Sequence, residues 1–143
     1  MMTTMTTAPR PHATELATIR LHEGLVGFPD TESYSVIGGD GGVFELAPVD
    51  GAGPTFVAAV AGFFFPDYHP VLDDVTAQRL DLSDADDALV LVIVTVGSDI
   101  SAAYGNLFAP VVVNTRTGAA EQVVLSGQDF PLRAPLVAAA AGH

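Results

Sequence analysis

We expect the sequence to fold as an all-β domain, mainly antiparallel, in one compact β-barrel-like unit with one short helix or irregular crossover. Apolar runs of strand length recur along the chain, and clusters of glycine and proline separate them (14 Gly and 10 Pro in total). A length of 143 residues is that of a single ordinary domain. We place this domain at residues 16–136, after a disordered leader at residues 1–15 and before a flexible tail at residues 137–143.

The first half of the chain contains three apolar segments with the character of strands. In "LATIRLHE", apolar Ile19 and Leu21 alternate with polar Arg20 and His22, which is the pattern of a half-buried strand. "YSVIGGDGGVFELAP" predicts a hairpin, because its central glycines permit the positive φ of tight turns. "TFVAAVAGFFF" predicts a buried strand that ends at Pro66, with successive phenylalanines on opposite faces.

The second half begins with a change of pattern. Apolar residues at roughly helical spacing between positions 71 and 80 predict the short helix or crossover. "ALVLVIVTV" is apolar at both parities, so we expect both faces of this strand to be covered. Two further strands at residues 111–115 and 122–125 are joined by a turn with Gly118 in the left-handed position.

The charge of the chain limits the classes of partner. Seventeen acidic residues face five basic ones, all arginine, which gives a net charge of -12. Nucleic acids and anionic membranes would both be repelled, so we expect neither as a direct partner. Complementary charge favours a basic protein surface, although such charge also simply aids solubility. The chain has no cysteine and its first residues lack the apolar stretch of a secretory signal, so we expect a cytoplasmic protein.

We find no pattern of residues that predicts catalysis, a metal site or a cofactor. "HEGLV" begins like the zinc-binding H-E-x-x-H motif, but Val26 stands where the second histidine belongs. The glycine-rich turn lacks the register of a dinucleotide-binding loop, and Ser126 does not lie in a nucleophile elbow. One enzymatic alternative stays open, namely a small β-barrel enzyme that uses the adjacent ionisable residues Asp67, Tyr68 and His69.

Several separated motifs, in order over residues 16–136, resemble the FliW family of flagellar assembly factors. They are "GLVGFP" at residues 24–29, "FFPDY" at 64–68, "NLFAPVVVN" at 106–114, "QVVL" at 122–125 and "FPLRAPL" at 130–136. The resemblance implies a barrel without catalytic activity that binds flagellin in the cytoplasm and antagonises CsrA, an RNA-binding translational regulator. Flagellin and CsrA would then act as opposing ligands, so that export of flagellin frees the factor to bind CsrA.

We expect a monomer whose partner-binding residues come from the family-like motifs and the acidic stretch that follows the phenylalanines. The candidates are Phe65, Asp67, Tyr68, Asp73, Asp74, Asn106, Pro110 and Asn114. For Asn106, Asn114 and Gln122 we rate another role higher, because polar side chains at strand ends satisfy backbone groups that the sheet leaves open.

The sequence departs from the family pattern at two places. "LAPV", with Pro48 and Val49, replaces a Leu-Gln stretch, and Glu121 stands where a basic residue often precedes the QVVL-like strand. These departures bear on the edge that would meet CsrA. A flagellin chaperone that has lost CsrA binding is therefore a second alternative.

Overall fold

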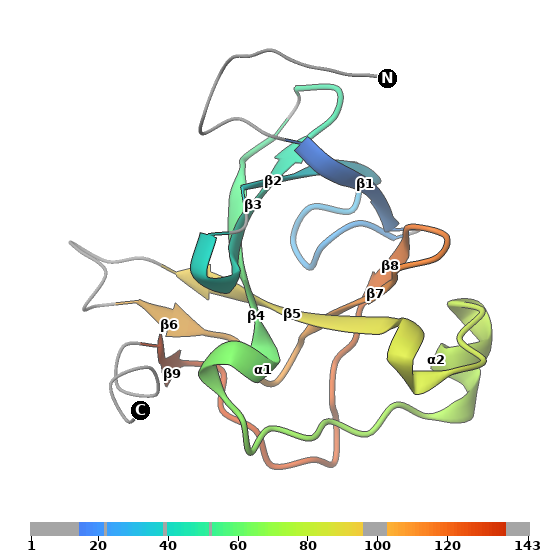
Figure 1. The fold of residues 1–143 in the computed structure, drawn as a ribbon, viewed down its shortest axis with the longest axis vertical. Coiled ribbons are helices and arrows are strands. Elements are labelled where there is room, and N and C mark those ends of the chain that lie inside the picture. The colour runs from blue at the N-terminus through green and yellow to red at the C-terminus, as the bar shows by residue number, and fades with distance from the viewer. Residues whose placement is uncertain (1–14, 22, 39, 52, 96–102, 137–143) are drawn as a thin grey trace.

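The computed structural model describes residues 15–21, 23–38, 40–51, 53–95 and 103–136, which form a closed β-barrel (Figure 1). The leader and tail proposed from the sequence lie outside these residues, except that Glu15 opens the first strand, and His22 lies outside them too. The strands are β1 (Glu15–Leu21), β2 (Ser33–Gly38), β3 (Val43–Pro48), β4 (Phe56–Val60), β5 (Ala88–Thr95), β6 (Tyr104–Gly105), β7 (Val111–Asn114), β8 (Ala119–Gln122) and β9 (Ala134–Pro135).

Seven of these strands make the barrel, in the order β4-β3-β2-β1-β8-β7-β5, and β5 pairs with β4 to close it. Every pairing is antiparallel except β1–β8, which is parallel and spans only Arg20 opposite Ala119 and Leu21 opposite Ala120. β6 pairs with the end of β5, and β9 pairs with β6 beside the barrel. The all-β, mainly antiparallel barrel predicted from the sequence is confirmed.

Apolar side chains fill the barrel and also cover part of its outside. Leu21, Tyr34, Leu46, Leu91 and Val111 are buried inside, with almost no exposed surface. Neighbouring strand residues point outward into two further clusters, and the larger of these contains Ala59, Val92, Val94, Leu107 and Leu136. Because successive residues of a strand face opposite sides, β5 is covered on both faces, as its sequence predicts.

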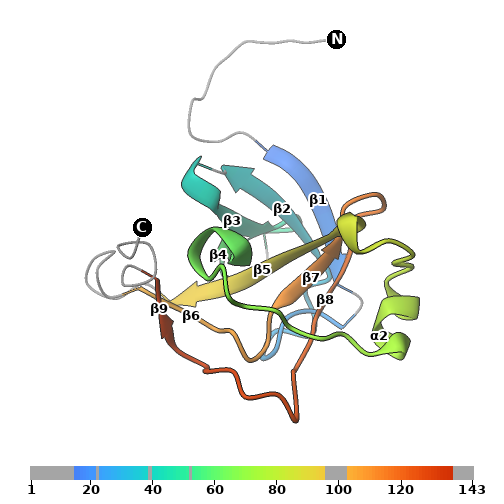
Figure 2. The ribbon, with the colours of Figure 1, turned by 60° about the horizontal axis from the view of Figure 1, so that its bottom comes forward.

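Among the described residues, two short helices interrupt the strands, with α1 at Ala61–Phe64 and α2 at Asp74–Arg79. Single 3-10 turns lie at Asp40–Gly42 and Ala85–Asp87. Figure 2 shows α2 outside the barrel, on the side of β7 and β8. The predicted short helix is therefore present. Within the described part of the chain, neither helix has the length and apolar character that crossing a bilayer demands.

The prediction of a strand running to Pro66 is wrong. β4 ends at Val60, and the next four residues form a helical turn in which the Phe65 N–H donates to the Ala61 carbonyl. The turn lets Phe64 and Phe65 pack into the outer cluster, while Phe63 stays 60% exposed. Burial of two aromatic rings on the barrel's outer face outweighs the strand preference of the three phenylalanines. The expected alternation of their faces fails with the strand.

The last barrel strand, β8, begins at Ala119 and ends at Gln122, earlier than the predicted residues 122–125. Gly118 has φ of 82° and completes the turn, so the ladder starts at the next residue. Beyond Gln122 the chain still follows its neighbour, since the Val123 N–H donates to the Pro110 carbonyl. Proline has no N–H to return, so the regular ladder stops there.

Candidate partner-binding surface

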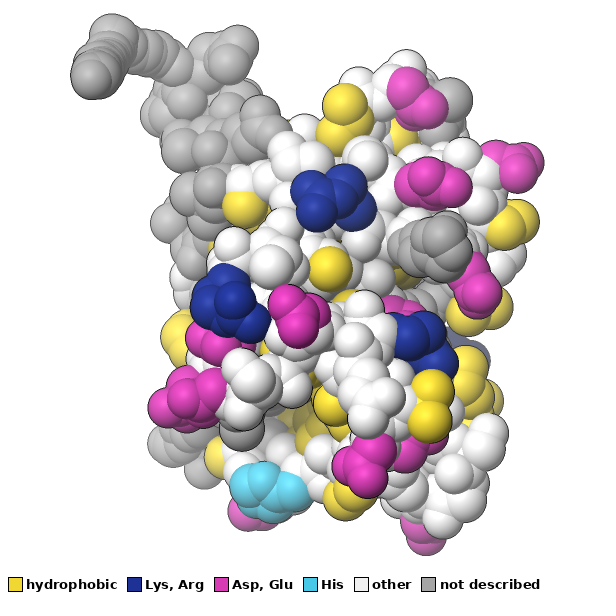
Figure 3. Space-filling view, turned by 90° about the vertical axis from the view of Figure 1, so that its right-hand side faces the viewer, with side chains coloured by type: hydrophobic (Ala, Val, Ile, Leu, Met, Phe, Trp, Pro, Cys, Tyr) yellow, Lys and Arg dark blue, Asp and Glu magenta, His cyan; other side chains and the backbone are white. Residues whose placement is uncertain are grey.

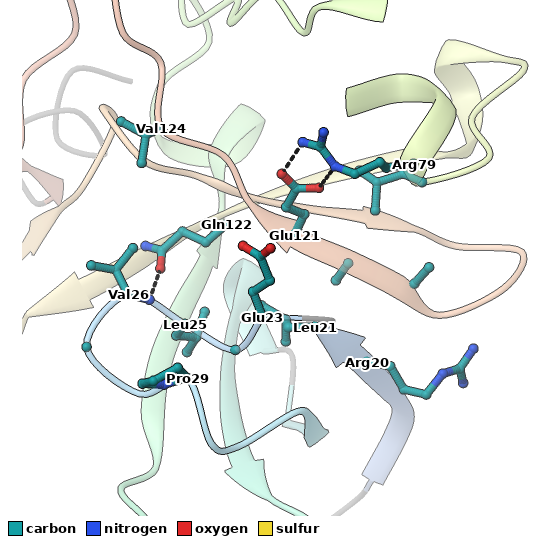
Figure 4. A pocket seen from close by; sticks show the side chains of 15 residues that line it. Arg20, Leu21, Glu23, Leu25, Val26, Pro29, Arg79, Glu121, Gln122 and Val124 are labelled. Carbon is teal, nitrogen blue, oxygen red and sulfur yellow. Dashed lines mark hydrogen bonds and ion pairs between the residues drawn. The ribbon is translucent and has the colours of Figure 1, made fainter. Parts of the chain in front are cut away.

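A groove opens where β1 and β8 separate. After Leu21 the chain turns away from β8 through a bond from the Gly24 N–H to the Leu21 carbonyl, whereas β8 continues along β7. The groove between them has a volume of about 810 Å³. Figure 4 shows its walls, which come from the 23–29 loop, from β8 and from the end of α2.

The loop that forms one wall is fixed by its own sequence. Gly24 has φ of 70°, and a Cβ on it would collide with the Phe28 carbonyl, so the close turn requires glycine. Leu25 is buried in the barrel core, with 3% of its surface exposed. The next residue, Val26, consequently lies at the rim of the groove with 68% of its surface exposed.

Gln122 connects the two walls. Its Oε1 accepts a hydrogen bond of 2.7 Å from the Val26 N–H, and its Nε2 donates one of 3.1 Å to the Ala109 carbonyl. The side chain thus satisfies backbone groups that no strand partner reaches. This confirms the interpretation of Gln122 as a residue that completes the sheet edge.

Charged side chains form the other end of the groove. Arg79 of α2 donates from Nε and Nη2 to the two carboxylate oxygens of Glu121, at 2.9 and 2.6 Å. The hydrogen bond that Arg79 donates to Glu121 is the main reason that the pKa of Arg79 is raised, and the charges of Glu121, Asp73 and Glu23 add to it. The two paired side chains are 52% and 30% exposed, and surface pairs of this kind contribute little to stability.

Glu23 extends from the loop toward the carboxylate of Glu121 (Figure 4). Within the described part of the chain, its own carboxylate makes no hydrogen bond or ion pair. Arg20 lines the groove but points away from this cluster, and its Nη2 donates to the Thr117 carbonyl at 3.2 Å. Of the two carboxylates, only that of Glu121 is paired with the Arg79 guanidinium. Figure 3 shows this side of the molecule, where arginines lie among carboxylates and apolar side chains line the hollow between them.

The structure places Phe65, Asp67 and Tyr68 away from this groove. The Tyr68 hydroxyl donates to the Leu107 carbonyl at 2.7 Å, its ring packs edge-on against Phe130, and burial raises the pKa of Tyr68. Phe65 is half-buried in the outer cluster, and Asp67 is exposed.

The structure does not assemble the trio of Asp67, Tyr68 and His69 into an acid–base site. Asp67 and His69 are exposed, whereas the Tyr68 hydroxyl is taken by a backbone carbonyl. No hydrogen bond joins the three side chains in the described structure.

Asp73 and Asp74 lie at the start of α2. Asp73 is the N-cap, and its Oδ1 accepts a 2.8 Å hydrogen bond from the Thr76 N–H. Hydrogen bonds from the Thr76 side chain and, to a smaller extent, from its backbone lower the pKa of Asp73. Asp74 lies in the first turn of α2 with its side chain exposed. A negative charge at this end of a helix interacts favourably with the helix dipole.

Asn106, Pro110 and Asn114 organise backbone. The Oδ1 of Asn106 accepts hydrogen bonds from the N–H groups of Phe108 and Ala109, at 3.0 and 3.1 Å. Pro110 and Asn114 are fully buried, so neither presents a surface to a partner in this structure. The interpretation that Asn106 and Asn114 satisfy open backbone groups is confirmed.

None of the eight candidates from the sequence lines the groove. The residues of the groove that sequence reasoning missed are Glu23, Val26, Arg79 and Val124. Glu121 is noticed in the sequence as a departure, and the structure gives it a partner in Arg79. The other departure, at Pro48 and Val49, does not line the groove. Pro48 ends β3, and Val49 follows it with 57% of its surface exposed.

Comparison with known proteins gives a consistent result. The family model described as "FliW protein" matches residues 3–136. The chain is 33% identical over 121 residues to the flagellar assembly factor FliW of Treponema pallidum, covering 84% of this chain and 81% of that protein. It is 31% identical over 121 residues to the factor of the same name from Bacillus licheniformis, covering 83% and 85%.

A solved structure agrees with the sequence relatives. The crystal structure of the flagellar assembly factor FliW superposes with a TM-score of 0.78 and 26% identity, covering 83% of this chain and 84% of that one. Residues 3–136, which the family model matches, include both walls of the groove and every strand of the barrel. The chain belongs to the FliW family of flagellar assembly factors.

Proposed function

We propose that the protein acts in the cytoplasm as a monomer that binds flagellin and antagonises the translational regulator CsrA by direct protein–protein contact. Flagellin and CsrA exclude each other, so free flagellin leaves CsrA active and exported flagellin releases the factor to bind CsrA. A coupling of about 1–3 kcal/mol between two ligands already changes affinity about five- to 150-fold. No catalytic step is needed.

The observation that carries this proposal is family membership over residues 3–136. The surface charge supports it. The chain has a net charge of -12, and the exposed carboxylates of Asp67 and Asp74 have no hydrogen bond or ion pair within the described residues. An RNA-binding regulator carries basic surface to meet phosphates, and such a surface is complementary to these carboxylates.

The exposed acidic residues remain our candidates for direct contact, namely Asp67, Asp73 and Asp74. Phe65, Tyr68 and Asn106 support them by holding the surrounding chain in place. Pro110 and Asn114 are left out of the contact surface because they are buried.

Titration of the purified protein with flagellin and with CsrA from the same organism tests the proposal. We expect each to bind at micromolar concentration or tighter, and flagellin to weaken the binding of CsrA. Failure of both to bind a protein that circular dichroism shows to be folded would remove the proposal. Binding of flagellin alone would support the flagellin chaperone that has lost CsrA binding.

A pair of variants tests the contact residues. Asp67→Asn with Asp74→Asn removes two exposed charges of the candidate contact residues, and Asp30→Asn with Asp86→Asn removes two exposed charges outside that set. Both double variants change the net charge equally, so a general field effect weakens binding equally in the two. A contact role predicts a larger loss for the first pair, measured as the dissociation constant at fixed salt.

A further inference from the structure

Just beyond the end of β8, the groove contains an open backbone edge at Val124. Val123 and Leu125 donate their N–H groups to the Pro110 and Phe108 carbonyls of the neighbouring segment. In an extended chain, alternate residues direct their backbone groups to opposite sides. The backbone N–H and carbonyl of Val124 therefore face the groove. Within the described part of the chain its backbone N–H and carbonyl make no hydrogen bond, and 50% of its surface is exposed.

An apolar wall lies opposite this edge. Val26 on the loop is 68% exposed, and it lines the same groove as Leu25, Pro29 and Val124. The bond from the Val26 N–H to Gln122 holds the loop at a fixed distance from β8. Two exposed valines facing a shared hollow favour an aliphatic side chain between them.

The charged end of the groove favours a cation. Glu23 points at the carboxylate of Glu121, whose two oxygens already accept from the single guanidinium of Arg79. The three side chains together carry one uncompensated negative charge. A lysine or arginine side chain that enters between the carboxylates neutralises it and relieves the repulsion between them.

We propose that this groove binds an extended segment of a protein partner, which lies along β8 with a lysine or arginine between Glu23 and Glu121 and an aliphatic side chain against Val26 and Val124. Addition of a peptide to a free strand edge draws affinity from main-chain hydrogen bonds and specificity from side-chain pockets. The groove volume of about 810 Å³ is sufficient for a few side chains. The inference rests on the proposed function in one respect, since it takes the occupant to be a polypeptide.

A synthetic peptide tests the groove without any natural partner. The probe is an eight-residue peptide of alternating threonine and valine with capped ends and one central arginine, and its matched control carries glutamate in place of the arginine. Titration of isotope-labelled protein, followed by NMR, reports which backbone amides shift. We expect shifts at Val26, Gln122 and Val124, a dissociation constant of about 1 mM or lower, and binding of the control about two- to fivefold weaker.

Two variants localise the charge effect. Glu23→Gln should abolish the preference for the arginine peptide, because it removes the uncompensated carboxylate. Glu45→Gln, at an exposed position of β3 outside the groove, removes the same charge and should leave the preference unchanged.

The proposal is overturned by any of three results. These are the absence of shifts at the groove residues at millimolar peptide, equal affinity for the two peptides, and an unchanged preference in Glu23→Gln. The titrations with flagellin and CsrA separate this outcome from the proposed function. Flagellin or CsrA binding without peptide binding refutes the groove alone, and peptide binding without either protein refutes the proposed function alone.

Discussion

Replacing Asn114 with alanine measures how strongly the chain around α2 is attached to the barrel. Asn114 ends β7 and is fully buried. Its Nδ2 donates to the carbonyls of Leu80 and Asp81, at 2.7 and 3.1 Å, and its Oδ1 accepts from the Arg116 N–H at 2.9 Å. One side chain therefore joins the end of α2 to the barrel and also shapes the β7–β8 turn.

The size of the effect follows from these three bonds. The bond to Leu80 is buried, and a buried acceptor left without a donor costs about 1–3 kcal/mol. The bonds with Asp81 and Arg116 are only partly buried, so water replaces part of them and each is worth about 0.5–1 kcal/mol. We expect Asn114→Ala to lower the free energy of unfolding by about 3 kcal/mol.

Urea unfolding followed by far-ultraviolet circular dichroism is the assay, because the chain has no tryptophan. Gln128→Ala is the matched control, since the Gln128 amide also makes two bonds to backbone, from the Val71 N–H at 3.0 Å and to the Val71 carbonyl at 2.9 Å. Those bonds are exposed to water, so the control should lose less than about 1 kcal/mol. An Asn114→Ala variant within about 0.5 kcal/mol of the parent protein would refute the reasoning.

The variant Asn114→Asp adds a test by pH. The carboxylate still accepts from the Arg116 N–H, but it places negative charge against two carbonyl oxygens in a buried position. Burial and the carbonyls raise the pKa of this carboxyl above its unfolded value of about 3.9, so the folded state binds the proton more tightly. The destabilisation relative to the parent protein is therefore full above the folded pKa and shrinks as pH falls through it. A difference independent of pH would contradict this reading.

Two further predictions concern a turn and a helix cap. Gly118→Ala should lower the free energy of unfolding by about 1–3 kcal/mol, because φ is 82° and a Cβ would lie 2.8 Å from the Thr18 carbonyl oxygen. Gly27→Ala, where φ is 88° but the space around the residue is open, should lower it by only about 1–2 kcal/mol in the same urea assay. Asp73→Ala should lower the melting temperature at neutral pH by removing the cap of α2. Because bonds from Thr76 depress the pKa of Asp73, that stabilisation is present above the unfolded pKa and is lost as pH falls through the folded pKa, so the melting temperatures of parent and variant should converge in acid.

Local patterns in the sequence predicted the elements whose causes are themselves local. The alternation of Ile19 and Leu21 marks the buried face of β1, and both are buried. The glycines between β2 and β3 allow the hairpin turn, and the two strands pair in register from Tyr34 opposite Pro48 to Gly38 opposite Phe44. These features depend on residues close in the chain, so periodicity and turn chemistry suffice to find them.

Features set by contacts between distant residues escaped the same reasoning. The parallel contact of β1 with β8 brings Arg20 beside Ala119, and nothing in either strand's periodicity specifies that register. The groove is a consequence of where this contact ends, so its residues carry no joint signal in the sequence. The helical turn of α1 likewise depends on an outer apolar surface that the rest of the fold supplies.

The arrangement of charge gives the proposed binding its expected dependence on salt. Each described arginine already interacts within the chain. Arg79 and Arg116 form ion pairs with Glu121 and Asp87. Arg20 donates a hydrogen bond to the Thr117 carbonyl, and Arg133 lies over the Tyr104 ring. Only Arg79 and Arg116 pair with carboxylates among these four, so most of the described carboxylates are left to act on a partner. Salt screens exposed charges over about 8–10 Å, so it should slow association with a basic partner. Exchanging Arg79 and Glu121 together for glutamines keeps the net charge, so this double variant should retain the salt dependence while it changes only contacts at the groove.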